Sequence, residues 1–197
     1  MGGKWQAGSS ARFIRPAILY TVRLHRTISR LDDTADRVFR PLRANPKANW
    51  AFYVASEAAD YSIAWHVISA VMATLWRRRR RHSLRLAVML GIESILVNGV
   101  LKRLTKRVRP PMLAHRAHEV RRPKTSSFPS GHASSAALAT VLLSDAAPRL
   151  RPLWLALAAT VSASRVHNRM HHASDVAAGV ALGTLIGWAT KRVWPLR

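Results

Sequence analysis

The sequence contains no cysteine, which excludes disulfide bonds, thiolate metal ligands and cysteine nucleophiles. Acidic residues are scarce too: 9 Asp and Glu stand against 32 Lys and Arg, a formal net charge of +23. A chain this basic is expected to meet polyanions such as nucleic acid, anionic lipid headgroups or phosphates. The first residues lack a short apolar core followed by a small-residue cleavage site, so we expect no signal peptide.

Charge is nevertheless absent from long stretches of the chain, which is 49% apolar. Five apolar runs follow Asn45-Pro46, at about 51–76, 84–101, 133–147, 153–163 and 176–190. A membrane-spanning helix needs about 20 mainly apolar residues. The runs approach that length with their flanking residues, the fourth only if it continues to about Val166. We therefore predict an all-α fold, a polytopic membrane bundle of about five spanning helices. A soluble helical bundle is the alternative.

The N-terminal segment has a different pattern. Between residues 14 and 31 apolar residues recur with helical spacing, and arginines lie mostly on the other side. This pattern predicts a basic amphipathic helix that lies on a membrane surface, with an ordinary soluble surface helix as the alternative. Residues 32–34, Asp-Asp-Thr, can cap a short second helix that ends at about Leu42. We accordingly divide the chain into an interfacial segment, 1–45, and a membrane domain, 46–197.

Basic loops separate the apolar runs. The five arginines at 77–81 could form a nucleic-acid patch, but between two apolar spans they indicate a cytoplasmic loop. Eleven of the 32 basic residues, Arg85 among them, fall on this membrane face and twenty-one on the other, so the sequence does not decide the orientation. We expect an integral protein of a bacterial-type cell membrane with no nucleic-acid partner; the oligomeric state stays open.

The most unusual polar stretch, at residues 164–175, contains three histidines, two arginines and an aspartate between two apolar runs. His171 and Asp175 are four residues apart, which places them on one face if the chain is helical there. A carboxylate so placed can accept a hydrogen bond from one ring nitrogen and leave the other with a free lone pair. The pair could serve as nucleophile, base or metal ligand; a hydrated basic loop is the alternative.

Two further clusters adjoin the spans and are predicted to reach the same membrane face. Lys102 and Arg109 are seven residues apart, nearly aligned over two helical turns, and Pro110 should end that helix at Arg109. Ser130 is a good helix N-cap, so the first turn after it, beginning at Gly131, offers free N–H groups to an anion. Taken alone, the first cluster could be a basic helix end and the second an ordinary capped helix.

Taken together, the clusters supply three cations, an anion-binding helix start and two histidines, His132 and His171. This combination suits a phosphate monoester, because cations and amides can neutralise the phosphoryl oxygens while a nucleophile and an acid act in line.

The spacings Lys-x6-Arg-Pro, Pro-Ser-Gly-His and Ser-Arg-x5-His-x3-Asp, in this order, resemble the signature motifs of the type 2 phosphatidic acid phosphatase (PAP2) superfamily. The resemblance covers roughly residues 50–190. It implies an integral membrane lipid phosphatase that needs no metal or cofactor and forms a phosphohistidine. His171 would be the nucleophile, oriented by Asp175, and His132 would protonate the leaving group and then activate water. The residues implied to hold the phosphate are Lys102, Arg109, Ser130, Gly131 and Arg165. Membrane members usually have six spans, whereas this sequence has five and the amphipathic helix.

Several alternatives stay open at this point. His132, His171 and Asp175 could ligate a metal. The motifs also resemble vanadium haloperoxidases, although the apolar spans argue against that soluble class. A non-enzymatic basic module that binds anionic lipid is a further alternative, and a transporter is less favoured. We expect the polar residues inside the spans to form interhelical hydrogen bonds: Glu57, Asp60, His66 and Glu93. Lys106 and Arg107 could attract a headgroup or simply be solvated, and the basic loop 108–124 is the expected selectivity element.

Overall fold

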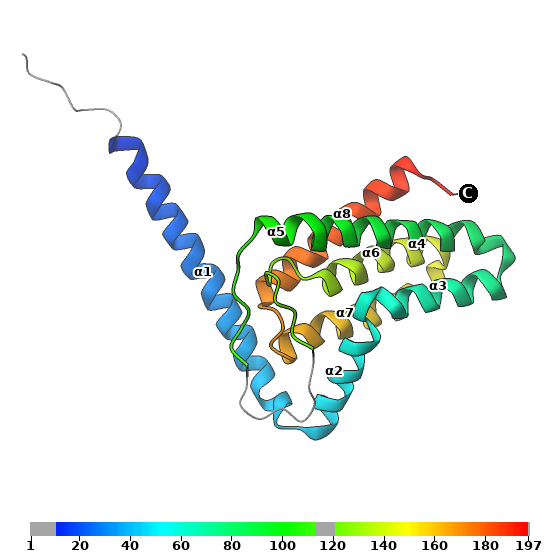
Figure 1. Cartoon of the computed structure of the whole chain (residues 1–197), viewed down its shortest axis with the longest axis horizontal. Helices are drawn as coiled ribbons and strands as arrows, with labels where there is room; N and C mark the ends of the chain where they lie inside the picture. Colours follow the sequence, from blue (N-terminus) through cyan, green and yellow to red (C-terminus); the bar gives the residue numbers. More distant parts are fainter. Residues whose placement is uncertain (1–10, 113–120, 197) are drawn as a thin grey trace, which may run out of the picture.

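The computed structural model describes residues 11–112 and 121–196, with side chains from residue 25 onward. Within these residues the chain is helical, as predicted, and forms no strand (Figure 1). The main helices are α1 (Ala11–Arg43), α2 (Pro46–Ala58), α3 (Ile63–Leu75), α4 (Arg80–Ser94), α5 (Lys102–Leu104), α6 (Gly131–Ala146), α7 (Arg151–His167) and α8 (Ala173–Val193). Short helical turns connect them: η1 (Asp60–Ser62), η2 (Arg77–Arg79), the π-helical η3 (Ile95–Leu101) and η4 (Pro148–Leu150).

Helix α6 is the centre of the bundle and packs against α4, α7 and α8. Nearly every residue from Ala133 to Leu143 is buried, and most are Ala or Ser. Leu138 and Leu142 on α6 meet Leu90 of α4 and Trp65 of α3 in the main apolar core. The small side chains let the helix axes approach closely, so close packing along α6 holds the bundle together.

The contact between α6 and α8 depends on three glycines spaced four residues apart. A Cβ atom added at Gly183 would overlap the carbonyl oxygen of Ser134, and one at Gly179 would overlap that of Ser130. At Gly187 an added Cβ would lie 2.8 Å from the Cβ of Val141. These glycines therefore let the two helix backbones approach closely, and this contact fixes α8 along the length of α6.

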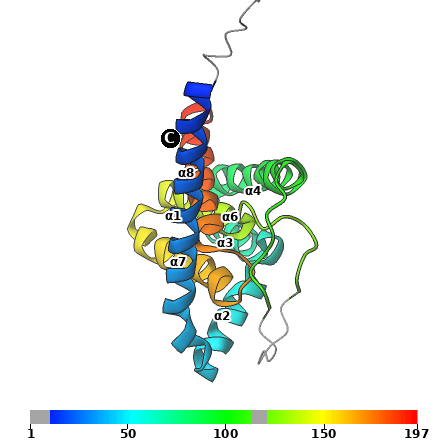
Figure 2. The same cartoon turned by 90° about the vertical axis from the view of Figure 1, so that its left-hand side faces the viewer.

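Helix α1 is one continuous helix of 33 residues, so the predicted break at residues 32–34 is wrong. Asp32 does not cap a second helix, because its carboxylate is buried against the first turn of α8. Figure 2 looks onto the end of the bundle and shows α1 lying across it, close to α7 and α8. That α1 lies along a membrane surface stays a prediction.

The first apolar run, 51–76, is not one helix. It is broken at η1, where Tyr61 and Ser62 have φ values of 50° and 60°. This left-handed conformation is costly for residues other than glycine, and it divides the run into α2 and α3. In the part of the chain that the structure describes, two helices are long and apolar enough to cross a membrane, Arg77–Leu104 and Ala173–Val193. The count of about five spans stays a prediction, since α3, α6 and α7 have 13, 16 and 17 residues.

The end of the bundle farthest from α1 is held by charge. Arg85 was grouped above with the loop arginines of one membrane face, but its side chain is fully buried. Its guanidinium donates to Asp145 at 2.5 Å and to the carbonyl of Trp194 at 2.9 Å. Lys191 lies 3.0 Å from the same carboxylate. Arg85 therefore ties α4 to the ends of α6 and α8, a structural role.

Candidate active site

Six of the eight predicted site residues line a cavity of about 520 Å³. These six are Lys102, Arg109, Gly131, His132, Arg165 and His171. The other two, Ser130 and Asp175, are fully buried behind the cavity wall. Residues from three distant segments of the chain thus meet at one place, and three of them are cations.

The first cluster reaches the cavity by a different route from the predicted one. The helix ends at Leu104, not at Arg109, because the backbone of Thr105 is already extended. The Thr105 hydroxyl donates to the Phe128 carbonyl at 2.7 Å, which ties this extended segment to the one before α6. Arg109 is therefore buried in a loop, where it donates to the Met170 carbonyl at 2.7 Å. Lys102 stays on the helix and donates to Asn98 at 2.8 Å.

The second cluster forms the start of α6. Ser130 is the N-cap, as predicted, and its hydroxyl accepts from the Ala133 N–H at 3.4 Å. Its own N–H donates to the Asp175 carbonyl at 3.0 Å, so the start of α6 is bonded to the first turn of α8. Gly131 follows next to Lys102, and an added Cβ would come within 3.7 Å of its ammonium. From the start of α6, Gly131, His132 and Ser135 line the cavity.

The acidic partner of His132 comes from the broken first run. Nε2 of His132 lies 3.2 Å from a carboxylate oxygen of Asp60. The left-handed turn at Tyr61 and Ser62 follows Asp60 directly, so the break in the helix turns this carboxylate toward the cavity. The predicted role of Asp60, a hydrogen bond between helices, describes this contact only in part, because the carboxylate also lines the candidate site.

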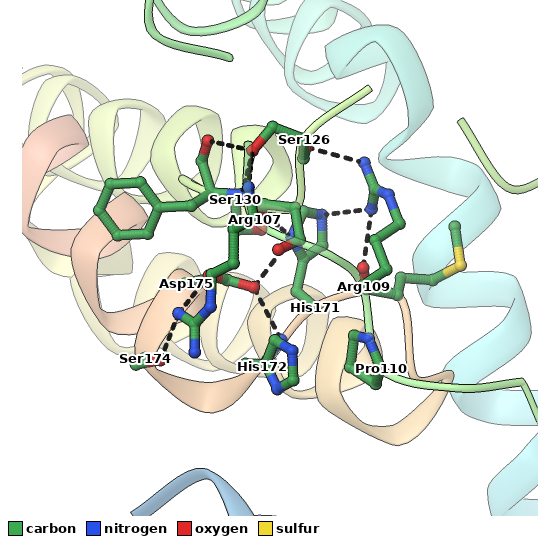
Figure 3. A network of polar contacts seen from close by, with 12 residues as sticks. Arg107, Arg109, Pro110, Ser126, Ser130, His171, His172, Ser174 and Asp175 are labelled. Carbon is green, nitrogen blue, oxygen red and sulfur yellow. Dashed lines mark hydrogen bonds and ion pairs between the residues drawn. The ribbon is translucent and has the colours of Figure 1, made fainter. Parts of the chain in front are cut away.

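The third cluster contributes Arg165 and His171. Arg165, on the last turn of α7, is buried and donates to the Ser56 hydroxyl of α2. His171 follows in the loop before α8, and its Nδ1 lies 2.6 Å from the Ser127 carbonyl oxygen (Figure 3). Because a carbonyl only accepts, Nδ1 carries the proton and Nε2 keeps its lone pair. That lone pair lies 3.4 Å from a guanidinium nitrogen of Arg109.

The predicted pairing of His171 with Asp175 on one helix face is wrong in its geometry. The chain is not helical at His171, and its Nδ1 lies 3.8 Å from the Asp175 carboxylate, farther than from the Ser127 carbonyl. Asp175 instead accepts from the His172 N–H at 2.9 Å and from Arg107 at 2.6 Å. Its negative charge is close enough to stabilise a charged imidazole, but the backbone sets the tautomer.

Burial lowers the pKa of His171 well below its ordinary value, and the positive charges of Arg165, Arg109 and Lys102 lower it further. The imidazole is therefore neutral at pH 7. A neutral ring with its free nitrogen among cations can attack an electrophile that carries negative charge.

Arg107 and Asp60 are the residues whose place in the site was not predicted. The alternative of a solvated Arg107 is wrong, because its guanidinium bridges Asp175 and Asp32 at 2.6 Å each. The expected selectivity loop, 108–124, falls partly outside the described residues, but Arg121 and Pro123 line the cavity. Within the described residues, no group of three or more His, Asp or Glu side chains is arranged to hold a metal ion.

Comparison with known proteins adds three findings. The model of the PAP2 superfamily matches residues 82–197. A search of curated proteins returned no match. Among solved structures, a transmembrane PAP2-type phosphatidylglycerolphosphate phosphatase from Bacillus subtilis superposes with a TM-score of 0.67 and 24% identity, over 94% of this chain and 96% of that one. LpxE from Aquifex aeolicus gives a TM-score of 0.64 and 19% identity, over 79% and 93%. At these identities the likeness establishes a common fold.

Proposed function

The chain belongs to the PAP2 superfamily, and on this premise we propose that it is an integral membrane phosphatase that removes a terminal phosphate from a lipid phosphate or diphosphate. The observation that carries the proposal is the bond from Nδ1 of His171 to the Ser127 carbonyl, which leaves Nε2 unprotonated in a cavity with Lys102, Arg109 and Arg165. A phosphoryl group brings negative charge to be neutralised and a phosphorus atom to be attacked, which is what this arrangement supplies.

In the proposed reaction, Nε2 of His171 attacks phosphorus and the bond from phosphorus to the leaving oxygen breaks. His132 donates its proton to that oxygen, so the lipid leaves as an alcohol, or as a monophosphate when the substrate is a diphosphate. The product is a phosphohistidine. His132, now neutral, takes a proton from water, the water oxygen attacks phosphorus, and the bond to Nε2 breaks to release phosphate.

The roles of the buried residues follow from their contacts. Ser130 caps α6 with its hydroxyl, so we propose that it shapes the phosphate site, while the Gly131 backbone forms the wall that faces the phosphoryl group. Asp175 stabilises the positive charge that builds on His171 during attack, because its carboxylate lies 3.8 Å from Nδ1. The proposed mechanism requires no metal or other cofactor.

The shape of the cavity supports a lipid substrate. Its lining includes His66 of α3 and Gly91 and Ser94 of α4, all of them exposed, so it opens at the side of the bundle between these helices. Large apolar side chains beside this opening are exposed: Val67, Val71, Ile92 and Ile95. A lipid in the membrane could place its phosphate in the cavity and leave its apolar tail outside.

The test is phosphate release in detergent from a panel of phosphatidate, phosphatidylglycerol phosphate, a polyprenyl diphosphate and a polyprenyl-linked sugar phosphate. We expect His171→Ala to lower kcat by about 10³-fold or more. His82→Ala is the matched control, because it removes a histidine from α4 outside the cavity. A wild type that hydrolyses none of these lipids, or a His171→Ala variant that is as active as the control, overturns the proposal.

Two further measurements separate the proposal from its alternatives. Activity should survive treatment with a chelator, whereas a metal hydrolase should lose it. The second measurement is binding of anionic vesicles to wild type and to His171→Ala. A basic lipid-binding module needs no histidine, so it would bind the vesicles equally in both. Binding without phosphate release would favour that module.

A further inference from the structure

Asp32 lies in α1, outside the residues that match the family model, yet it is buried beside the candidate site. We propose that Asp32 is a positioning residue: together with Arg107 it holds the first turn of α8, and so fixes Asp175 beside His171. This inference rests on the proposed function only for its catalytic readout. Its evidence is the set of contacts that Asp32 makes from α1, a helix outside the three sequence motifs.

Asp32 is bonded to the start of α8 through two groups of one residue. One carboxylate oxygen accepts from the Ser174 backbone N–H at 2.8 Å, and the other accepts from the Ser174 hydroxyl at 2.8 Å. Ser174 is the second residue of α8, where a backbone N–H has no partner within the helix. A carboxylate at this point satisfies the N–H and stabilises the positive end of the helix dipole.

Asp32 is also joined to Asp175 through a shared cation. One guanidinium nitrogen of Arg107 lies 2.6 Å from Asp32, and the other lies 2.6 Å from Asp175 and donates to the Ser174 hydroxyl at 2.7 Å. Figure 3 shows Arg107 between Ser174 and Asp175. The Asp175 side chain is fully buried and that of Asp32 nearly so, so each depends on Arg107 to balance its charge.

Removing the charge of Asp32 should disturb Asp175 in a definite direction. Arg107 would then be attracted by Asp175 alone and would draw this carboxylate away from His171, to which it is not hydrogen-bonded. The charge that stabilises the phosphorylated imidazole would be weaker, so kcat should fall. The phosphate-binding cations do not touch Asp32, so KM should change little.

The experiment compares Asp32→Asn with Asp33→Asn, which removes an exposed carboxylate from the next position of the same helix. We expect Asp32→Asn to lower kcat roughly 10-fold and to leave KM nearly unchanged. A loss of this size is typical for residues that hold a functional side chain in place without touching the substrate. Asp33→Asn should stay within about two-fold, as is usual for an exposed surface position. Asp32→Glu should recover part of the loss, because it restores the charge.

A double-mutant cycle tests whether the effect passes through Arg107. In an Arg107→Gln background, Asp32→Asn should have a much smaller effect on kcat than in the wild type. Equal effects in both backgrounds, or an Asp32→Asn variant with the kcat of Asp33→Asn, overturn the proposal. Rates are taken per folded protein, measured by size exclusion, so a loss of kcat that only follows a loss of folded protein also counts against it.

A readout independent of catalysis separates this proposal from the proposed function. If the wild type hydrolyses no lipid in the panel, the proposed function fails, and amide hydrogen exchange still tests the positioning role. The Ser174 amide should exchange faster in Asp32→Ala than in Asp33→Ala, because only the former loses its acceptor. Equal exchange rates in these two variants would overturn it.

Discussion

The two histidines of the candidate site are held in different ways. His171 is fixed by backbone: Nδ1 bonds to the Ser127 carbonyl, and the arginine beside Nε2 is itself held by the Met170 carbonyl. His132 depends on a side chain, the carboxylate of Asp60, which reaches it from a strained turn. The Ser127 bond lies within the residues matched by the family model, whereas Asp60 lies outside them. The proposed nucleophile is thus held by backbone and the proposed acid by a side chain, so variants should separate the two roles.

Among variants of His132 and the turn that supports it, the largest effect should come from His132→Ala, and it should depend on the leaving group. With a lipid monoester the leaving alkoxide needs a proton, so kcat should fall by about 10²- to 10⁴-fold. With a diphosphate the leaving group is stable without it, so phosphorylation of His171 should continue and an acid-labile phosphoenzyme should accumulate. Single-turnover assays with a radiolabelled terminal phosphate measure both. Equal losses on the two substrates would contradict the role of His132 as the acid.

Asp60→Asn should have the next largest effect. Burial lowers the pKa of His132, as do the positive charges of Arg165 and Lys102, whereas Asp60 acts against this shift and favours the protonated imidazole. Without it, kcat should fall roughly 10- to 100-fold, and the alkaline limb of the pH profile should move to lower pH. Glu57→Gln, on the preceding helix, is the control. An alkaline limb that stays in place in Asp60→Asn would show that the carboxylate does not act on His132.

The acidic limb should report on His171. Its pKa is lowered by burial and by neighbouring cations, so the free enzyme keeps the neutral nucleophile at a pH where an ordinary histidine is protonated. We therefore expect kcat/KM to begin to fall only below about pH 6.5. Two substrates with different second phosphate pKa values distinguish enzyme from substrate ionisation. If kcat/KM began to fall already above pH 7 on the acidic side for both substrates, the assignment of the acidic limb to His171 would be contradicted.

The same shift links stability to pH. The unfolded chain binds a proton at His171 near pH 6.5, and the folded protein binds it only at lower pH. The free energy of unfolding should therefore decrease as the pH falls below about 6.5. His171→Ala should lose this part of the acid sensitivity, which thermal unfolding in detergent between pH 5 and 7 measures.

The smallest effect should come from the turn that carries Asp60. Ser62 has a φ of 60°, which glycine adopts without cost and a β-branched residue does not. Ser62→Gly should change the free energy of unfolding by less than about 1 kcal/mol, because relief of strain offsets the entropy of the glycine. Ser62→Val should lower it by about 1–3 kcal/mol. Thermal unfolding compares the two, and equal melting temperatures would contradict the strain.

The sequence was informative where a contact has a local signature. The Ser130 cap has a side chain of the right type before an apolar run, and Gly179 and Gly183 have the spacing of a helix contact. Features set by distant contacts were not predictable in this way. The helix ends at Leu104, where Thr105 turns extended and its hydroxyl bonds to the distant Phe128 carbonyl, and no nearby residue type indicates this. Asp32 looks like a helix cap, and only the tertiary structure places it against Ser174.

The glycine contact between α6 and α8 has a practical consequence for engineering. His132 is carried by α6 and Asp175 by α8, and Gly179 and Gly183 leave no room for the two helices to slide. Attempts to alter which lipid is accepted should therefore leave this contact intact. Diversity is better introduced around the opening between α3 and α4, where Gly91 has open space for a new side chain. A library restricted to that opening could alter lipid preference without disturbing the spacing of the reacting groups.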